Sequence, residues 1–256
     1  MAEGWGEIPV LYEDNHLLVA VKPAGVLSQP DGSEAPDMLA LLKEGIRIRH
    51  NKPGNIFLGL VHRLDRPVGG VMVFARTSKG ASRLSAQIRE RRFGKEYIAV
   101  LRGMPRDPVG TLRDYMVRNG PDGRSGFTSS EGEGKEAVLR YQVMDRLPDG
   151  GASLVRIRLE TGRTHQIRAQ FARIGCPVWG DARYGGPDAG SGVKGGIALF
   201  ACGIAFLHPV RGEPMRFTAL PDPDGPWGMF ADRLRAGLPE WDGWETDHGQ
   251  KQETQP

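Results

Sequence analysis

The chain has 256 residues, of which 39% are apolar and 25% charged, so it is long enough to bury a substantial core and has the composition of a globular protein. It has no apolar run of the roughly eighteen residues that cross a membrane and no N-terminal secretion signal, so we expect a cytoplasmic protein. Cys176 and Cys202 are too few and too far apart for a zinc ribbon or a disulfide framework, and we expect both to be small buried side chains.

The net charge of +3 conceals an uneven distribution. Residues 76–118 carry eleven Lys or Arg against four Asp or Glu, whereas residues 221–256 carry eight acids and three bases. A basic body with an acidic end fits a polyanionic partner better than a small neutral substrate. For residues 78–92 alone, a solvated helix face explains the charge equally well.

Strands and one helix are predicted in the first part of the chain. Residues 8–12 and 16–21 are predicted strands joined by a turn. Apolar side chains at helical spacing predict a helix over residues 37–49. The apolar run at residues 70–75 then predicts a buried strand.

A second helix comes next, followed by irregular chain. Ser78 is a suitable N-cap for a helix that runs to about Arg92, and a strand is predicted at residues 97–101. Residues 104–136 are rich in glycine, proline, serine and charged residues, so we expect loops and short hairpins there.

The second half of the chain predicts four strands and one helix. Thr164 is expected to cap the helix, which ends near Ile174. The strands are expected at residues 135–145, 153–160, 197–206 and 215–219.

The composition changes at Pro221, where the chain becomes rich in proline and aspartate. We expect one short amphipathic helix near residues 229–235 and a disordered polar end. No repeat or earlier break divides the chain, so residues 1–220 are predicted to form one α+β domain and residues 221–256 an acidic C-terminal tail. The expected sheet is mixed, largely antiparallel, and flanked by helices and loops.

The most informative stretch is residues 62–70, where a carboxylate stands between two arginines in a predicted turn before an apolar strand. The cations Arg63 and Arg66 favour the ionised form of Asp65. An ionised carboxylate suits a nucleophile or a base better than an acid. The competing interpretation is that Asp65 caps a turn or pairs with an arginine at the surface.

A second constellation lies at residues 161–168, with the sequence Thr-Gly-Arg-Thr-His-Gln-Ile-Arg. Gly162 is expected to close a strand, and Arg168 lies about one helical turn beyond Thr164 on nearly the same face. Such a turn presents backbone donors and cations to an anion or a carboxylate.

Together these segments resemble the signatures of the RluA-type pseudouridine synthases. The motifs that carry the resemblance are His62-Arg63-Leu64-Asp65, Lys95-Glu96-Tyr97, and the segment from Gly162 to Arg168. Three further segments agree, at residues 18–25, 180–185 and 206–209, so that the resemblance covers residues 8–220. The chain departs from the family at Val68-Gly69-Gly70, where Thr-Ser-Gly is common, which puts a hydrogen bond of the turn in doubt.

The resemblance implies a single pseudouridine synthase catalytic domain that converts uridine to pseudouridine inside ribosomal or transfer RNA, with base flipping and without a cofactor or metal. Too few residues precede the first strand to hold the N-terminal RNA-binding module of many relatives, so we expect that this module is absent. We expect RNA as the partner, no membrane association, and a monomer.

The same resemblance assigns roles to individual residues. Asp65 is the essential carboxylate, acting at C1′ as a nucleophile or at C2′ as a base, and Arg168 pairs with it. Tyr97 stacks on the flipped base and takes part in proton removal from C5, and Arg63 fills the vacated place in the RNA stack. The other expected substrate-binding residues are His62, Arg163, Thr164, His165 and Gln166. For both histidines we prefer a structural role over direct catalysis, and Leu64 and Ile167 are expected to pack beneath the site.

Three other functions compete with this interpretation. A non-haem iron oxygenase could use His62, Asp65 and His165 as ligands, provided that the turn bends sharply enough to bring them together. An RNA-binding protein without catalysis would use the basic surface alone. A glycosidase is disfavoured because no second carboxylate is expected near Asp65 to act as its partner.

Overall fold

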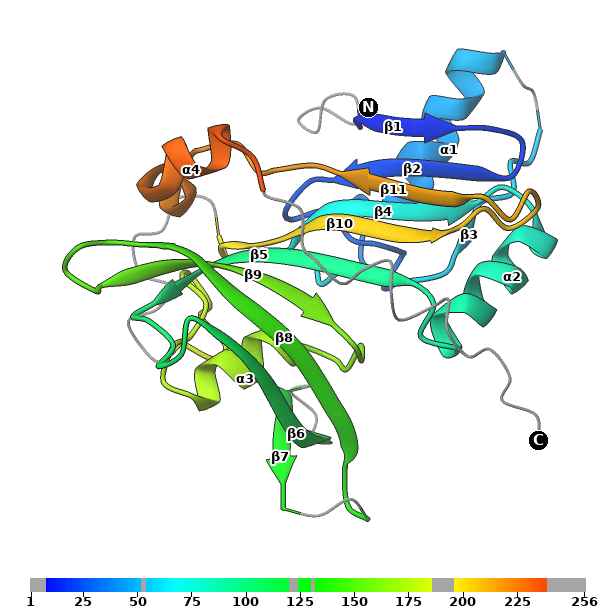
Figure 1. Ribbon diagram of the computed structural model, residues 1–256. Helices are drawn as coiled ribbons and strands as arrows, with labels where there is room; N and C mark the ends of the chain where they lie inside the picture. Colours follow the sequence, from blue (N-terminus) through cyan, green and yellow to red (C-terminus); the bar gives the residue numbers. More distant parts are fainter. Residues whose placement is uncertain (1–7, 52–53, 120–123, 130–131, 186–195, 239–256) are drawn as a thin grey trace, which may run out of the picture.

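A twisted sheet of eleven strands organises the computed structural model, which describes residues 8–51, 54–119, 124–129, 132–185 and 196–238 (Figure 1). The strand order is β1-β2-β4-β10-β5-β9-β8-β6-β7, with β3 paired to β4 and β11 paired to β10. Only the β4–β10 pair is parallel among these strands. The expectation of an α+β fold with a mixed, largely antiparallel sheet is confirmed.

The first half of the sheet combines five strands from the N-terminal part of the chain with two strands, β10 and β11, from its C-terminal part. Its strands are β1 (Val10–Glu13), β2 (Leu17–Lys22), β3 (Gly59–Leu60), β4 (Gly69–Ala75), β5 (Gly94–Arg102), β10 (Leu199–Leu207) and β11 (Pro214–Thr218). The strand β4 is buried along its whole length, since Met72 and Phe74 face one hydrophobic cluster and Val71 and Val73 another.

The second half of the sheet leans away from the first and is formed by one continuous stretch of chain (Figure 1). Its strands are β6 (Val109–Asn119), β7 (Arg124–Thr128), β8 (Lys135–Arg146) and β9 (Ala152–Leu159). Residues 104–136 therefore contain a long strand, β6, in place of only loops and short hairpins. Their polar composition is compatible with a strand because β6 and β7 stand at the sheet edge, where side chains reach solvent.

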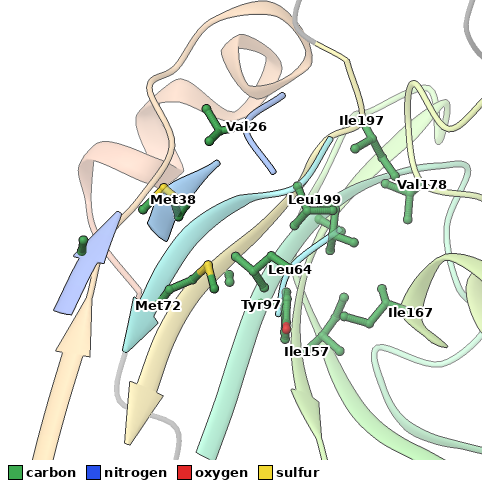
Figure 2. Close-up of a cluster of buried hydrophobic side chains, with 14 of the residues drawn as sticks. Val26, Met38, Leu64, Met72, Tyr97, Ile157, Ile167, Val178, Ile197 and Leu199 are labelled. Carbon is green, nitrogen blue, oxygen red and sulfur yellow. The ribbon is translucent and has the colours of Figure 1, made fainter. Parts of the chain in front are cut away.

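Two helices, α1 and α3, pack on one face of the sheet, the face on which Tyr97 of β5 lies. Helix α1 (Met38–His50) begins where the Asp37 carboxylate accepts the N–H groups of Leu39 and Ala40. Helix α3 (Gln166–Arg173) begins at His165, in the left-handed conformation with φ 52°, and not at the expected cap Thr164. Both helices contribute to one cluster with the central strands, shown in Figure 2.

The other face of the sheet is covered by α2 (Ser78–Arg89), η1 (Gly225–Phe230) and α4 (Ala231–Arg235). Helix α2 is capped by Thr77, whose hydroxyl accepts the N–H of Gly80, rather than by the expected Ser78. Phe230 and Leu234 are buried against β5 and β9, so the packed fold continues beyond Pro221. The end expected to be disordered, residues 239–256, lies outside the described residues.

Within the described residues, no helix is long and apolar enough to cross a membrane. Cys176 and Cys202 are both buried free thiols, as the sequence predicted. Burial raises the pKa of both thiols, as expected for cysteines that act as apolar side chains.

Candidate active site

Asp65 lies in the turn between β3 and β4, at a cavity of about 540 Å³ on the face that carries α1 and α3. The lining of this cavity includes the Asp65 turn, Tyr97 on β5, and residues 162–168 at the start of α3. The sheet thus brings the three motifs of the sequence to one place, although about a hundred residues separate the first from the last.

Backbone groups and buried hydroxyls hold the Asp65 turn. The N–H of Val68 donates to the carbonyl of Asp65 at 3.0 Å, so the turn is closed without the hydroxyls that Val68 and Gly69 lack. Ser28 accepts the N–H of Leu64 at 3.1 Å and donates to its carbonyl at 2.8 Å. Gly70 has φ 133°, and a Cβ there would overlap the backbone of Ala201, so only glycine fits beside β10.

Lys22 supports the same turn from below. Its ammonium group is buried and donates to the carbonyls of Pro23, Val26 and Arg66 at 2.6 to 3.1 Å. Burial lowers the pKa of Lys22 to about 7, and the nearby Asp65 carboxylate opposes this shift. Lys22 therefore fixes the backbone next to Asp65, with its three donors satisfied by carbonyl groups.

Arg168 is the cation that contacts Asp65, with Nη1 at 3.2 Å from Oδ2. The same guanidinium donates from Nε and Nη2 to the two oxygens of Asp181, both at 2.8 Å. Burial acts to raise the pKa of Asp181, but the hydrogen bonds and charge of Arg168 outweigh it and hold the pKa below its ordinary value. The two-pronged pair with Asp181 thus aims Arg168 at Asp65.

The expected flanking arginines do not surround Asp65 in this way. Arg66 donates from Nε to the carbonyl of Gly25 at 3.1 Å and so anchors the neighbouring loop. Arg63 is exposed at the rim of the cavity, where the resemblance placed a residue that reaches into RNA. The contact with Asp65 is made instead by Arg168, the arginine that the resemblance paired with it, and not by the two arginines that flank Asp65 in the sequence.

His165 approaches Asp65 from the other side. Its Nε2 lies 3.5 Å from Asp65 Oδ2, and its Nδ1 lies 3.0 Å from the hydroxyl of Tyr184. That hydroxyl also accepts the N–H of Ser125 at 2.8 Å, an arrangement that suits a phenol proton donated to Nδ1 and a ring proton on Nε2. Burial lowers the pKa of His165, while Asp65 opposes the shift.

Tyr97 lies on the cavity side of β5 and is 8% exposed. In Figure 2 it is grouped with Leu64 and Ile167, both of which are buried beneath the site as the sequence predicted. Burial, followed by the negative charge of Asp65, raises the pKa of Tyr97, so its phenol is neutral at physiological pH. A neutral ring at the floor of a cavity can stack on a base.

His62 and Gln166 serve the protein interior. His62 Nε2 accepts the N–H of Val73 at 3.1 Å, and burial lowers the pKa of His62 to about 3, which fits the structural role preferred for it, although the residue also lines the cavity. The side-chain oxygen of Gln166 accepts the hydroxyl of Thr161 and the N–H of Arg163, so it holds the turn before α3.

Arg163 and Thr164 line the cavity as expected for residues that contact the substrate. The Nε of Arg163 also donates to the carbonyl of Glu136 at 2.7 Å, which fixes the position of its guanidinium group. Both residues are therefore placed at the entrance of the cavity by the turn that precedes α3.

The geometry of the site disfavours both the non-haem iron oxygenase and the glycosidase. Among the described residues, no three His, Cys, Asp or Glu side chains are grouped to hold a metal ion, and the Nε2 of His62 is bound to the backbone. A second carboxylate, Asp181, lies on the far side of Arg168 from Asp65, and both of its oxygens accept hydrogen bonds from that guanidinium. Its lowered pKa makes Asp181 a poor proton donor for a glycosidase.

Three residues of this site were not assigned a role from the sequence: Asp181, Tyr184 and Lys22. A signal existed, because they belong to the segments 180–185 and 18–25 that contributed to the resemblance. Their contacts depend on the packing of distant segments, which spacing along the chain does not reveal.

The comparisons with known proteins agree with this geometry. Residues 16–173 match the family model described as RNA pseudouridylate synthase. The chain is 35% identical to ribosomal large subunit pseudouridine synthase C of Salmonella typhimurium, covering 82% of this chain and 65% of that protein. It is 34% identical to the uncharacterized RNA pseudouridine synthase YhcT of Bacillus subtilis, covering 82% of this chain and 67% of that protein.

Two solved structures share the fold. Human RNA pseudouridylate synthase domain containing 4 superimposes with a TM-score of 0.71 at 22% identity, over 89% of this chain and 93% of the other. Human RNA pseudouridylate synthase domain containing 1 does so with a TM-score of 0.69 at 26% identity, over 87% of each. The family match over residues 16–173 and the level of identity over most of the chain show that it belongs to the RNA pseudouridylate synthase family.

Proposed function

We propose that this protein converts uridine to pseudouridine within an RNA chain and that Asp65 is the catalytic carboxylate. The observation that carries the proposal is the position of Asp65: its side chain is 30% exposed at a cavity, beside Arg168 and above Tyr97. The chain spans 65% of the length of the Salmonella relative, whose name refers to the large ribosomal subunit. That name favours ribosomal RNA as the substrate over transfer RNA.

The reaction exchanges one bond for another without a change in composition. The bond between N1 and C1′ breaks, the uracil turns, and C5 bonds to C1′; C5 then loses a proton and N1 gains one. Asp65 begins the reaction either by attacking C1′ as a nucleophile, in a bond that C5 displaces when it attacks C1′, or by removing the C2′ proton as a base, which it returns to C2′ once C5 has bonded to C1′. Arg168 Nη1 and His165 Nε2 lie 3.2 and 3.5 Å from Asp65 Oδ2 and hold this carboxylate in place at the cavity.

The remaining roles follow from where the side chains lie. Tyr97 provides a flat neutral surface for the uracil and an oxygen close to the C5 proton. Arg63, at the exposed rim, fills the place in the RNA stack that the flipped nucleotide leaves. Arg163 and Thr164 hold the nucleotide at the cavity entrance. The expected monomeric state stays a prediction.

The test is tritium release from RNA labelled at C5 of uridine, combined with a map of pseudouridines in the RNA of cells with and without the gene. We expect release by the purified protein and loss of at least one pseudouridine from ribosomal RNA in the deletion strain. RNA binding without tritium release on any cellular RNA would contradict the proposal and support the binding protein without catalysis.

A further inference from the structure

A second cavity, also of about 540 Å³, adjoins the catalytic one. The two share a wall formed by Ile88, Lys95, Leu159, Gly162 and Arg163. A polymer that enters one cavity can therefore continue into the other, whereas a free nucleotide has no need of both.

Cations from separate elements converge on this second cavity. Its described lining has one acid, Glu160, and six basic residues: Arg89, Arg91, Lys95, Arg140, Arg158 and Arg163. Glu160 is itself paired with Arg140, and Arg158 contacts the buried carboxylate of Glu96. An excess of cations in a concave surface attracts a polyanion.

Arg91 has a left-handed backbone conformation, which costs free energy for a residue that carries a side chain. It follows the last turn of α2 with φ 57°, and the N–H groups of Arg91 and Arg92 donate to the carbonyls of Ile88 and Gln87. This is the helix ending in which glycine ordinarily occupies the left-handed position. The chain places a long cation there instead.

The local contacts of Arg91 do not account for that choice. Its guanidinium lies 3.7 Å from the carboxylate of Glu136, and its side chain is 60% exposed. An exposed ion pair at this distance contributes little to stability. Another described residue with a positive φ, His165, lies next to Asp65, so strained backbone occurs at both cavities.

We propose that the second cavity binds the phosphodiester backbone of the RNA strand next to the target uridine, with Arg91 as one of its phosphate ligands. The inference rests on the proposed function, because the neighbouring cavity is assigned to the target nucleotide. It divides the substrate between two places: the reacting nucleotide at Asp65, and the adjoining stretch of RNA among the basic residues of the second cavity.

The sharpest test is Arg91→Gly, because it should raise stability and weaken binding at once. Relief of the left-handed arginine should raise the unfolding midpoint by roughly 2 °C. Loss of one phosphate contact should raise the Kd for a labelled oligouridylate several-fold and reduce the slope of log Kd against log salt by about 0.7. The KM for C5-tritiated RNA should rise, with kcat unchanged.

Three variants serve as controls. Asn51→Gly relieves a left-handed residue at the end of α1, away from both cavities, and should leave Kd unchanged. Arg106→Gln removes an exposed charge beyond the opposite end of β5 and should change Kd far less than Arg91→Gly. Arg91→Lys keeps the charge and should bind nearly as well as the parent protein.

Two outcomes would overturn the inference. If Arg91→Gly leaves Kd and the salt slope unchanged, the cavity does not bind the strand at Arg91. If it lowers the unfolding midpoint, the pair with Glu136 is what Arg91 provides. Failure of the proposed function has a different signature, because the parent protein would then bind the oligouridylate and release no tritium.

Discussion

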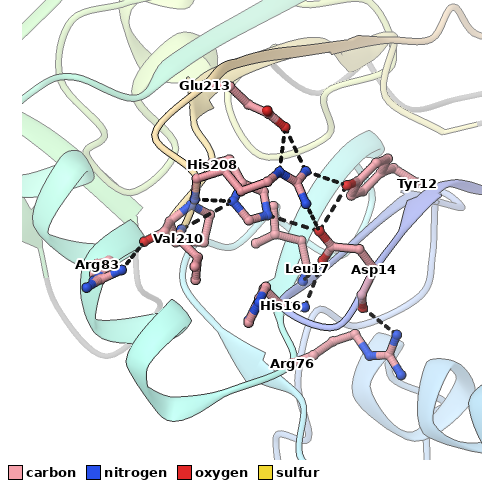
Figure 3. Close-up of polar contacts among 11 residues, drawn as sticks. Tyr12, Asp14, His16, Leu17, Arg76, Arg83, His208, Val210 and Glu213 are labelled. Atoms are coloured by element: carbon pink, nitrogen blue, oxygen red, sulfur yellow. Dashed lines mark hydrogen bonds and ion pairs between the residues drawn. The ribbon is translucent and has the colours of Figure 1, made fainter.

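Asp14 and Asp65 are two carboxylates with similar neighbours and different surroundings. Asp14 follows β1 and contacts Arg211 and His208, as Asp65 contacts Arg168 and His165. Figure 3 shows that Asp14 also accepts the hydroxyl of Tyr12 and the backbone N–H of the turn that it closes. Its donors lie at 2.7 to 3.0 Å, whereas the two at Asp65 lie at 3.2 and 3.5 Å.

The difference separates a structural carboxylate from a reactive one. An ionised carboxylate has about four acceptor sites, and the five donors around Asp14 occupy them. Asp14 thereby ties the turn after β1 to the turn between β10 and β11. Asp65 keeps oxygen lone pairs directed at a cavity, where they are available to an electrophilic carbon or a proton.

Arg168→Lys should have the largest effect among the variants of residues around Asp65. A lysine supplies charge but cannot donate to Asp181 and Asp65 at once, so kcat should fall by roughly 10³-fold. Arg168→Ala should lose as much activity and also about 3 kcal/mol of stability, since two carboxylates lose their partner. Arg173→Lys, at an exposed pair on the same helix, is the control and should retain activity. Parental turnover by Arg168→Lys would exclude a positioning role for the guanidinium.

Asp181→Asn should reduce kcat by about 10²-fold, because an asparagine amide cannot accept both of the hydrogen bonds that Arg168 donates to the Asp181 carboxylate. The matched control is Asp114→Asn, because Asp114 also accepts hydrogen bonds from α3, through Gln170, but does not touch Arg168. Steady-state kinetics and an unfolding midpoint on each preparation separate a positioning effect from instability. An Asp181→Asn protein with a lower midpoint but parental kcat would show that Asp181 only stabilises the fold.

The pH dependence of stability should reveal Asp14. Its pKa is held well below the ordinary value near 4 because the hydrogen bonds outweigh burial, so its contribution is fully present above that value and is lost as the pH falls through the folded pKa. Asp14→Asn should therefore cost about 2 kcal/mol near neutral pH. The difference in the free energy of unfolding between the parent and the variant should narrow below about pH 4 in urea unfolding experiments. A gap that is constant down to about pH 2 would contradict this assignment.

Tyr184→Phe should have the smallest effect. It removes the hydroxyl that lies 3.0 Å from Nδ1 of His165 and orients this ring beside Asp65, and we expect kcat to fall roughly 5-fold, equivalent to about 1 kcal/mol. Tyr141→Phe deletes a hydroxyl from a ring that packs on Phe171 of α3 and should leave kcat unchanged. Equal kinetics for both variants would mean that the ring proton of His165 does not influence Asp65.

The sequence predicted most of the strands because apolar runs and alternation report burial on a sheet. The run at residues 70–75 corresponds to β4, and the pair at 135–145 and 153–160 to β8 and β9. Strand β6, which lies between β8 and the edge strand β7, was missed for the same reason, since its partly exposed side chains leave no clear apolar pattern. Helix starts were displaced by one or two residues where backbone conformation, as at His165, replaced a side-chain cap.

The site residues and the central contact between Asp65 and Arg168 were predicted through the resemblance, but the contacts that orient these two side chains were not. The resemblance identified Asp65 and Arg168, and the structure brings the two side chains within 3.2 Å. The sequence could not show that Arg66 contacts the carbonyl of Gly25, or that Asp181 and Tyr184 orient the side chains beside Asp65. Those contacts arise from long-range packing of segments whose sequences carry no information about their partners.

The most direct test of this account compares Asp65→Asn with Asp14→Asn in one set of measurements: tritium release from C5-labelled RNA, RNA affinity and unfolding midpoint. We expect Asp65→Asn to fold and bind RNA like the parent protein and to release no detectable tritium, since an amide is neither a competent nucleophile nor a base. We expect Asp14→Asn to unfold more readily and to keep the parental turnover per folded molecule. Turnover by Asp65→Asn at the parental rate would contradict the central claim.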